Sequence, residues 1–375
     1  MKWLGFFLLI MISLFSSACS SSAVDGNNTI NEQQNIKLDE NNTINEQQNI
    51  KIEKIAPQPI IYHDDANIPS LQSGYGTFGF YSVGTKSITN SSYAGNLQTT
   101  LYYPKELSHS RPTLFFYAGA GVYNANTYKG LFYFVASKGY NIIFLTYSNY
   151  SLRPLPSATQ EALTAFDSHV DRSKVGFIGH SMGAAVTFWM INELSELGGD
   201  ARILFPMASG YSAFNAYNMI PHDKTIVVPE NTKMIQQIYA KDYTTDIRIG
   251  IDLYLNNSIL EKDKDFMFVY GDSNHSADHG SMATRGGHDV NAMMQRTIFR
   301  PLDALMDEAF NKNMQAREQL YKELREDSYF NPYIGKTPHV DIRPYVLPEE
   351  NYPFNCSEGG TIESIRKEYC KALGL

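Results

Sequence analysis

Two kinds of hydrophobic pattern alternate along the middle of the chain, and together they predict an α/β fold. Short, nearly continuous apolar runs are typical of strands that are buried on both faces of a sheet. Longer runs with apolar residues three to four positions apart are typical of helices that cover a sheet. We expect strands over 113–117, 141–147, 175–178, 203–208, 234–239 and 266–270. We expect helices over 128–137, 157–170 and 182–197.

This alternation predicts a mostly parallel sheet of about eight strands with helices on both faces. Before it, β-branched and aromatic residues form short runs between Gly, Asn and Ser. Tyr75–Tyr81 and Leu97–Tyr103 are expected to be antiparallel opening strands, the second ended by Pro104. The stretch 210–232 is rich in Tyr and Asn and has no clear periodicity. We expect a loop there, which either borders a ligand or is an ordinary connection.

The N-terminus has the pattern of an export signal. A single Lys2 is followed by an apolar run, Leu4–Phe15, and by the small residues before Cys19. The run is shorter than the ~20 residues that a membrane-spanning helix needs. We assign the signal segment to residues 1–19 and expect it to be cleaved. We favour a lipoprotein signal, in which cleavage falls before Cys19 and the acylated Cys19 stays on the protein as its only membrane attachment. Ser16 stands where such signals usually have Leu, so ordinary secretory cleavage is the alternative.

Residues 20–58 are predicted to be a solvated linker, because they are polar and contain a direct repeat that starts at Asn27 and again at Asn41. The globular domain is expected over 59–345 and a C-terminal tail or helix over 346–375. The tail contains Cys356 and Cys370, the only cysteines besides Cys19. In an oxidising compartment these two could form a disulfide, and unpaired thiols are the alternative.

Composition narrows the classes of partner. The chain of 375 residues is 43% hydrophobic and 13% aromatic, which is sufficient for a large core. Its net charge of -8 and its isoelectric point near 5.6 argue against nucleic acid, whose binding needs a basic face. We expect a monomer.

One pentapeptide carries the chemistry: Gly179-His180-Ser181-Met182-Gly183. A Gly-x-Ser-x-Gly sequence between a strand and a helix places the serine at a sharp turn, and glycines let this turn pack without a clashing Cβ. An apolar strand precedes it and a small-residue helix follows it. We therefore expect Ser181 to be a nucleophile, and His180 to pack or hydrogen-bond rather than act as the base.

An acid and a base are expected after the serine, each past the end of a later strand. Asp242 follows the strand 234–239, and Asp246 is the alternative. His275 follows the strand 266–270 and is the favoured base, because imidazole takes up and returns a proton near neutral pH. His279 is the alternative, and His288 is more remote.

The same histidine-rich loop contains Asp272, Asp278 and Asp289, so a metal site is a further interpretation. We disfavour it because it would leave the serine turn unexplained, and we expect no metal and no organic cofactor.

Two backbone N–H groups should stabilise an oxyanion. One is that of Met182, the residue after the serine. The other is that of Ala120, in the small-residue loop after the strand 113–117, with Gly121 as the alternative.

Over about 74–310 the chain resembles secreted α/β-hydrolase esterases related to dienelactone hydrolases and cutinase-like polyester hydrolases. The resemblance lies in Tyr75-Gly76-Thr77-Phe78, Thr100-Leu101-Tyr102-Tyr103-Pro104, the Ser181 pentapeptide and Asn274-His275-Ser276. It implies the α/β-hydrolase fold, with His275 as base and Asp242 as acid. The loop 118–120 lacks the Pro-Gly-aromatic pattern of the polyester hydrolases. The resemblance therefore implies carboxylic-ester hydrolysis and does not separate a polymer from a small ester as substrate.

We therefore expect an exported serine hydrolase that cleaves a small-molecule or lipid-like ester through an acyl-Ser181 intermediate. A hydrolase-like surface lipoprotein that only binds is the alternative from another class. Peptidases and acyltransferases use the same triad chemistry, and the sequence does not separate them from esterases.

Overall fold

The computed structural model describes residues 62–63, 68–93, 97–148, 151–210, 225–271, 275–283, 290–330 and 332–338. All of them belong to one unit of the chain, Glu53–Leu375. The predicted signal sequence and linker, Cys19, Cys356 and Cys370 lie outside the described residues, as do His288 and most of the stretch 210–232.

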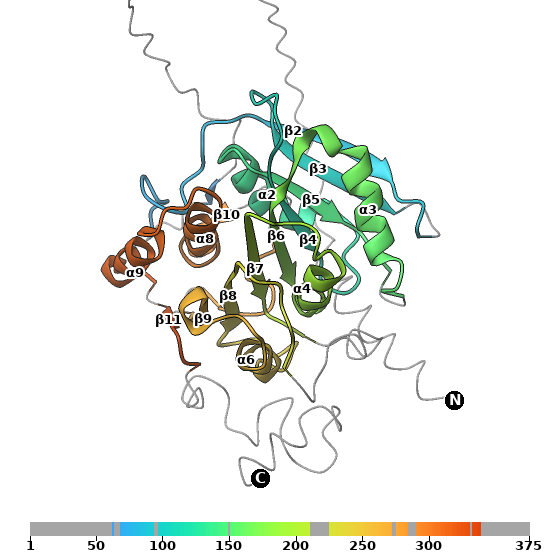
Figure 1. Cartoon of the computed structure of the whole chain (residues 1–375). Coiled ribbons are helices and arrows are strands. Elements are labelled where there is room, and N and C mark those ends of the chain that lie inside the picture. Colours follow the sequence, from blue (N-terminus) through green and yellow to red (C-terminus); the bar gives the residue numbers. More distant parts are fainter. Residues whose placement is uncertain are drawn as a thin grey trace, which may run out of the picture. The chain divides into compact units, whose positions relative to one another are not determined.

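A large, mostly parallel sheet forms the centre of this unit (Figure 1). Its order is β11-β9-β8-β7-β6-β4-β5-β3-β2, so the described residues form nine strands of it, where about eight were expected. The strands are β2 Val83–Thr89, β3 Gln98–Pro104, β4 Arg111–Tyr117, β5 Asn141–Leu145, β6 Val170–His180, β7 Ala201–Met207, β8 Thr232–Tyr239, β9 Lys264–Val269 and β11 Tyr333–Gly335. The strands from β5 to β9 in this order are parallel, whereas β2, β3 and β11 pair antiparallel.

Helices cover both faces of the sheet, as the sequence predicted. They are η1 Ala125–Tyr128, α2 Lys129–Ser137, α3 Leu155–Ala165, η2 Asp167–His169, α4 Met182–Glu193, α6 Arg248–Leu255, η3 Glu261–Asp263, α7 Ala292–Met294, the π-helical turn η5 Gln295–Phe299, α8 Arg300–Phe310 and α9 Ala316–Glu326. A separate short parallel pair joins β1 Tyr62–His63 to β10 Val290–Asn291.

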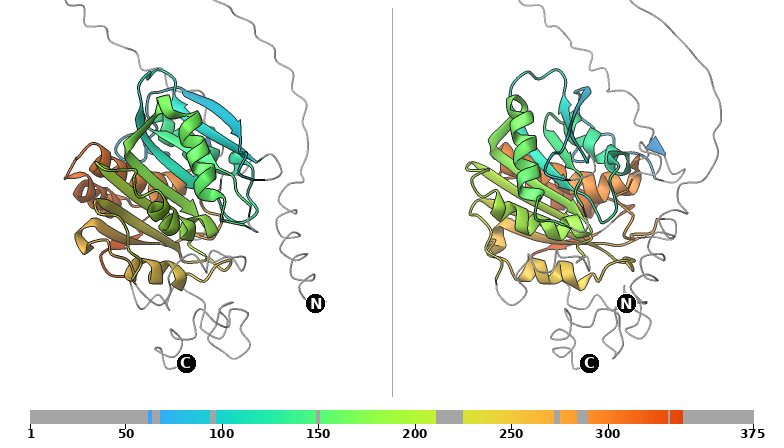
Figure 2. Two further views of the ribbon diagram at one scale, coloured as in Figure 1. Left: turned by 45° about the vertical axis from the view of Figure 1, so that its right-hand side comes forward. Right: turned by 90° about the vertical axis from the view of Figure 1, so that its right-hand side faces the viewer.

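The core is divided into two layers by the alternation of side chains along the strands. On β4, Leu114 and Phe116 pack in the layer that contains α2, α8 and α9, and Phe115 and Tyr117 pack in the layer that contains α3, α4 and α6. The two further views show the sheet between these helix layers (Figure 2). Strands buried on both faces explain why their sequences read as continuous apolar runs.

The prediction of a strand over Tyr75–Tyr81 is wrong. The antiparallel neighbour of β3 is instead β2, Val83–Thr89. Residues 74–76 instead bind helices: the Tyr75 hydroxyl donates to Asp307 at 2.7 Å, and the Gly76 N–H donates to Asp303 at 3.1 Å. Gly76 has a φ of +88°, and a Cβ there would lie 2.6 Å from the Gln295 carbonyl oxygen. A left-handed glycine and side-chain acceptors on α8 therefore replace the regular pairing of a strand.

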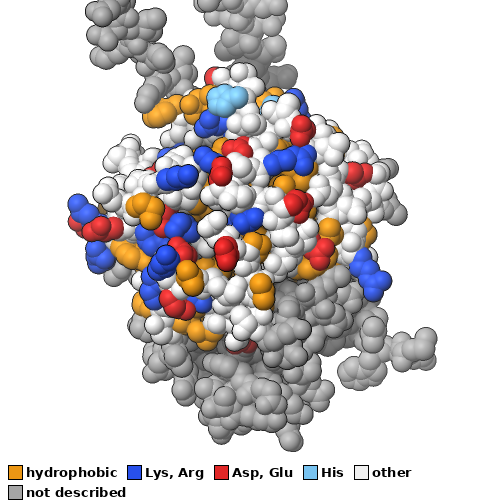
Figure 3. Space-filling model, in the orientation of Figure 1, with side chains coloured by type: hydrophobic (Ala, Val, Ile, Leu, Met, Phe, Trp, Pro, Cys, Tyr) orange, Lys and Arg blue, Asp and Glu red, His pale blue; other side chains and the backbone are white. Residues whose placement is uncertain are grey.

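The surface seen in Figure 3 mixes acidic and basic side chains, with hydrophobic side chains scattered among them. Such interspersed charge is typical of a solvated face. No helix among the described residues is long and apolar enough to cross a bilayer.

Candidate active site

Ser181 occupies a strained turn between the central strand β6 and helix α4. Its φ of 58° and ψ of -124° are unusual for a residue with a Cβ, and such conformations cost on the order of 1–3 kcal/mol. Bonds from the next strand hold the turn: the Ser181 N–H donates to the Met207 carbonyl at 2.9 Å, and the Gly210 N–H donates to the Ser181 carbonyl at 3.1 Å. The surrounding structure therefore fixes a backbone conformation that the serine would not adopt alone.

Both glycines of the pentapeptide are required by close packing. A Cβ on Gly179 would lie 2.2 Å from the Gly183 carbonyl oxygen, and a Cβ on Gly183 would lie 2.0 Å from the Tyr117 carbonyl oxygen. No side chain fits at such distances from backbone atoms. Helix α4 can therefore start directly after Ser181 while it packs against the end of β4.

Asp242, the expected acid, lies just past the end of β8 and is fully buried. Its carboxylate accepts hydrogen bonds from the N–H groups of Thr244 and Thr245 at 2.9 and 3.0 Å, and from the Thr245 hydroxyl at 2.8 Å. Burial by itself would raise the pKa of Asp242, but the hydrogen bond and charge of His279, with the Thr245 bonds, hold this pKa below its usual value. These contacts therefore favour the ionised form of Asp242.

The histidine on Asp242 is His279, the alternative from the sequence, and not the favoured His275. His279 Nδ1 lies 2.8 Å from Asp242 Oδ2. The His275 ring instead lies edge-on to Phe330, with ring centroids 5.3 Å apart. Asp246 is also buried, but the described histidine contact falls on Asp242.

The loop after β9 turns tightly so that His279 faces the acid. The Gly280 N–H donates to the Asp278 carboxylate at 2.9 Å, and the Asp278 N–H donates to the Ser281 hydroxyl at 2.8 Å. The Lys241 N–H donates to the Ala277 carbonyl at 2.8 Å, which ties this loop to the residue before Asp242. With Nδ1 on the carboxylate, the other ring nitrogen of His279 makes no hydrogen bond within the described part of the chain.

His180 brings the serine turn and His279 together. Its ring centroid lies 4.6 Å from that of His279, and its Nε2 lies 2.8 Å from the His279 carbonyl oxygen. On its other side, His180 Nδ1 lies 3.0 Å from the Tyr128 hydroxyl. The sequence suggested packing or hydrogen bonding for His180, and it gave no signal for Tyr128, which it placed only at the start of a helix.

His180 is buried, and this burial, together with the nearby His279, lowers its pKa to about 3. A histidine whose pKa is lowered by folding takes up its proton more readily in the unfolded chain. Its contribution to stability is therefore complete above about pH 6.5 and decreases as pH falls from there toward 3. His180→Gln should remove this contribution. Between pH 7 and pH 4.5 the wild type should lose about 2–3 kcal/mol more unfolding free energy than His180→Gln.

Urea unfolding at several pH values measures this difference. His109→Gln, which changes an exposed histidine, is the matched control. Parallel pH profiles for the wild type and His180→Gln would contradict a buried neutral imidazole at position 180.

The two segments expected to supply oxyanion donors meet at the serine. Met182 is the first residue of α4, so its N–H has no acceptor within the helix. The small-residue loop after β4 reaches the same place, since a Cβ on Gly119 would lie 3.2 Å from Ser181 Cβ. The Gly119 N–H is already bonded to the Tyr128 hydroxyl at 3.2 Å. The N–H groups of Ala120 and of the alternative, Gly121, have no acceptor among the described residues.

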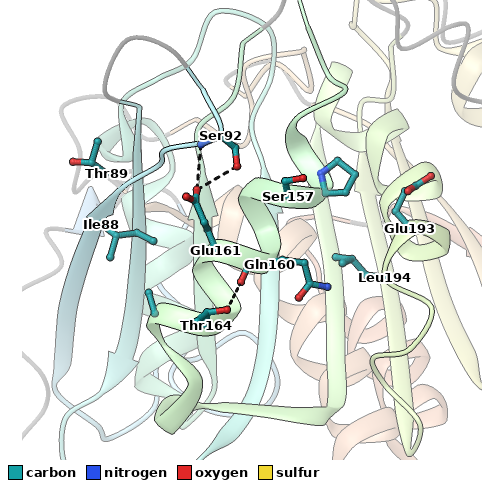
Figure 4. Close-up of a pocket in the computed structure, with 11 residues that line it drawn as sticks. Ile88, Thr89, Ser92, Ser157, Gln160, Glu161, Thr164, Glu193 and Leu194 are labelled. Atoms are coloured by element: carbon teal, nitrogen blue, oxygen red, sulfur yellow. Dashed lines mark hydrogen bonds between the residues drawn. The ribbon is translucent and has the colours of Figure 1, made fainter.

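A surface groove of about 650 Å³ lies elsewhere, between the end of β2, helix α3 and the end of α4 (Figure 4). Glu161 closes one side of it by accepting hydrogen bonds from Ser91 and Ser92. Neither Ser181, Asp242 nor His279 lines this groove. It is therefore separate from the candidate active site.

The metal interpretation gains no support from the described residues. They contain no group of three or more His, Cys, Asp or Glu side chains that could hold a metal ion, and Asp272 and Asp289 lie outside them.

No model of a known protein family matches this sequence, and a comparison with curated proteins finds no relative of it. Functional assignment therefore depends on the geometry around Ser181.

Proposed function

We propose that the chain is a serine hydrolase of the α/β-hydrolase fold that cleaves carboxylic esters. The observation that carries the proposal is the strained Ser181 turn, whose neighbour His180 contacts a histidine that is itself bonded to a buried aspartate. A buried carboxylate that holds an imidazole is the device that activates a serine in triad enzymes. A packing role would not require the serine to occupy a left-handed conformation.

The strand order supports the same fold. Counted from β2 along the chain, β4 is the third strand of the large sheet and leads into the loop 118–121. In α/β-hydrolases the loop after the third strand supplies one oxyanion donor, and the residue after the nucleophile supplies the other. The three candidates also follow in the order Ser181, Asp242, His279, which is the order of this fold.

The proposed reaction has two halves. The Ser181 hydroxyl attacks the ester carbonyl carbon while His279 Nε2 takes its proton, and the resulting oxyanion is bound by the N–H groups of Met182 and Ala120. The carbon–oxygen bond to the alcohol then breaks, and His279 returns the proton to the departing alcohol. Water, deprotonated by His279, attacks the acyl carbon. The bond from that carbon to the Ser181 oxygen then breaks, and His279 returns the proton to this oxygen as the acid leaves. Asp242 keeps the Nδ1–H tautomer of His279 and stabilises its protonated form.

The proposed location of the enzyme and its proposed substrate class are inferred from the sequence. The N-terminal signal and Cys19 favour an exported, lipid-anchored enzyme, and the resemblance favours a small or lipid-like ester. We propose no metal or organic cofactor, since the serine, acid and base account for every proton and bond in the two halves.

Covalent labelling tests the proposal directly. A fluorophosphonate probe should react with the native protein, and mass spectrometry of the digested product should find the phosphonate on Ser181. A panel of p-nitrophenyl esters of rising chain length should then show turnover and define the preferred acyl group. Absence of labelling in the native protein would favour the alternative of a hydrolase-like protein that only binds.

A further inference from the structure

Two buried polar side chains beside the candidate triad take no part in the proposed reaction. Tyr128 lies at the end of η1 and is fully buried, and His180 precedes the nucleophile and is 6% exposed. A buried hydroxyl or imidazole costs free energy unless it is hydrogen-bonded. Both groups are hydrogen-bonded, and their backbone partners are Gly119 in the loop after β4 and His279 in the loop after β9.

The donor and the acceptor of each hydrogen bond between Gly119, Tyr128, His180 and His279 follow from the chemistry of the groups. A backbone carbonyl can only accept, so His180 Nε2 carries the hydrogen and donates to the His279 carbonyl. In the neutral ring Nδ1 is then the acceptor, and the Tyr128 hydroxyl donates to it. The Tyr128 oxygen in turn accepts from the Gly119 N–H. One continuous chain of bonds therefore joins the loop 118–121 to the backbone of His279.

We propose that Tyr128 and His180 are positioning residues, which form a relay that fixes the oxyanion loop and the base relative to Ser181. This inference rests on the proposed function. At one end the relay holds Gly119, whose neighbour Ala120 is the second oxyanion donor. At the other end it holds the carbonyl of His279, whose ring must present Nε2 to the serine.

Two further contacts show that the relay has little freedom. The ring of His180 lies 4.6 Å from the ring of His279 at an interplanar angle of 41°, so His180 also limits the rotation of the base. The Tyr147 hydroxyl donates to the Ala118 carbonyl, which anchors the oxyanion loop one residue before Gly119. Because burial keeps His180 neutral, the tautomer that serves both partners persists at every pH at which the enzyme would work.

Tyr128→Phe tests the loop end of the relay. It leaves the Gly119 N–H and His180 Nδ1 without partners and allows His180 to adopt the other tautomer, which cannot donate to His279. Displacements near 1 Å in a reacting group cost on the order of 10²-fold in rate. We expect kcat on a p-nitrophenyl ester to fall about 10–100-fold while KM changes less than about threefold, because ester binding does not use these groups.

Two substitutions of His180 distinguish the bond to the His279 carbonyl from the bond to Tyr128. The amide nitrogen of Gln lies as many bonds from Cβ as His Nε2, so His180→Gln retains a donor for the His279 carbonyl. The amide of Asn instead reaches the position of Nδ1, so His180→Asn retains only the Tyr128 side. We expect His180→Asn to lose kcat as Tyr128→Phe does, and His180→Gln to recover at least about tenfold of that loss.

Tyr140→Phe is the matched control. Tyr140 is a buried tyrosine whose hydroxyl accepts a hydrogen bond from Asn311, but it precedes the start of β5, at the opposite end of the parallel strands from Ser181. It should lose a buried hydroxyl and keep wild-type kcat. Thermal melting of every variant separates misplacement of the base from unfolding.

Each kinetic outcome decides one question. Wild-type kcat in folded Tyr128→Phe and His180→Asn, with Ser181→Ala inactive, would overturn the relay and leave the nucleophile in place. A rise in KM at constant kcat, or a His180→Gln variant no better than His180→Asn, would also overturn it, since these side chains would then only shape the pocket. A wild type without labelling or turnover would remove the relay together with the proposed function.

A measurement on the folded protein keeps the proposal testable if the relay variants fail to fold. Nitrogen NMR shifts of the His180 imidazole in Ser181→Ala should show the Nε2–H tautomer. The Nδ1–H tautomer, or an average of the two, would overturn the relay.

Discussion

Ser181→Ala should reduce kcat for a short p-nitrophenyl ester by at least about 10⁴-fold and abolish labelling by a fluorophosphonate. Without the hydroxyl there is no atom to form the acyl-enzyme, and only binding and the oxyanion donors remain to speed direct attack by water. The variant should fold normally, because Ala and Ser both carry a Cβ and bear the same strain at a φ of 58°. Initial rates at saturating ester and mass spectrometry of the probe-treated protein measure the effect.

Ser137→Ala is the control for this substitution. Ser137 is a buried serine at the end of α2, and its hydroxyl donates to the Phe134 carbonyl and accepts from the Gly79 N–H. It should retain turnover and labelling, although the loss of these two bonds reduces stability by about 1–3 kcal/mol. Turnover by a folded Ser181→Ala protein at more than about a hundredth of the wild-type rate would exclude Ser181 as the nucleophile.

His279→Ala should be nearly as damaging, whereas His275→Ala should keep turnover within about tenfold of the wild type. The reason is the carboxylate: Asp242 Oδ2 lies 2.8 Å from His279 Nδ1, so this imidazole can be oriented and its cationic form stabilised. Asp242→Asn should cost about 10⁴-fold in kcat, because an amide can donate to Nδ1 and so stabilise the wrong tautomer.

The pair of histidine variants is a sharp test because the two residues lie in the same loop, four positions apart. Both proteins would be measured at several pH values with the same ester, with thermal melting as the check of folding. A greater loss of kcat in His275→Ala than in His279→Ala would reverse the assignment of the base. Equal, small losses in both would remove a histidine from the mechanism.

Much of the fold could be predicted from the sequence, because it depends on local pattern. The apolar runs correspond to β4 through β9, and the turn between β6 and α4 falls where the pentapeptide indicated. The exceptions have clear causes. β11 is three residues long and exists because it pairs with the edge of β9, and Tyr75–Tyr81 has the composition of a strand but bonds to α8 and α9 instead.

The later helices could have been predicted. Residues 300–310 and 316–326 have the spacing of amphipathic helices, and they form α8 and α9. The contact between Tyr128 and the serine turn could not be predicted, since nothing near Tyr128 in the sequence distinguishes it from the other aromatic residues of the core. Its role depends on the approach of its hydroxyl to His180, 52 residues away in the chain.

The sequence by itself determined the place of the Ser181 turn, because a strand, a glycine-flanked turn and a helix are consecutive in the chain. It also favoured Asp242, since the end of β8 fixes where the chain emerges from the sheet, but it left Asp246 as an alternative. Only the tertiary structure showed which of His275 and His279 contacts Asp242. Both follow β9 in one polar loop, and the hydrogen bonds that bend this loop back onto Lys241 determine which imidazole meets the carboxylate.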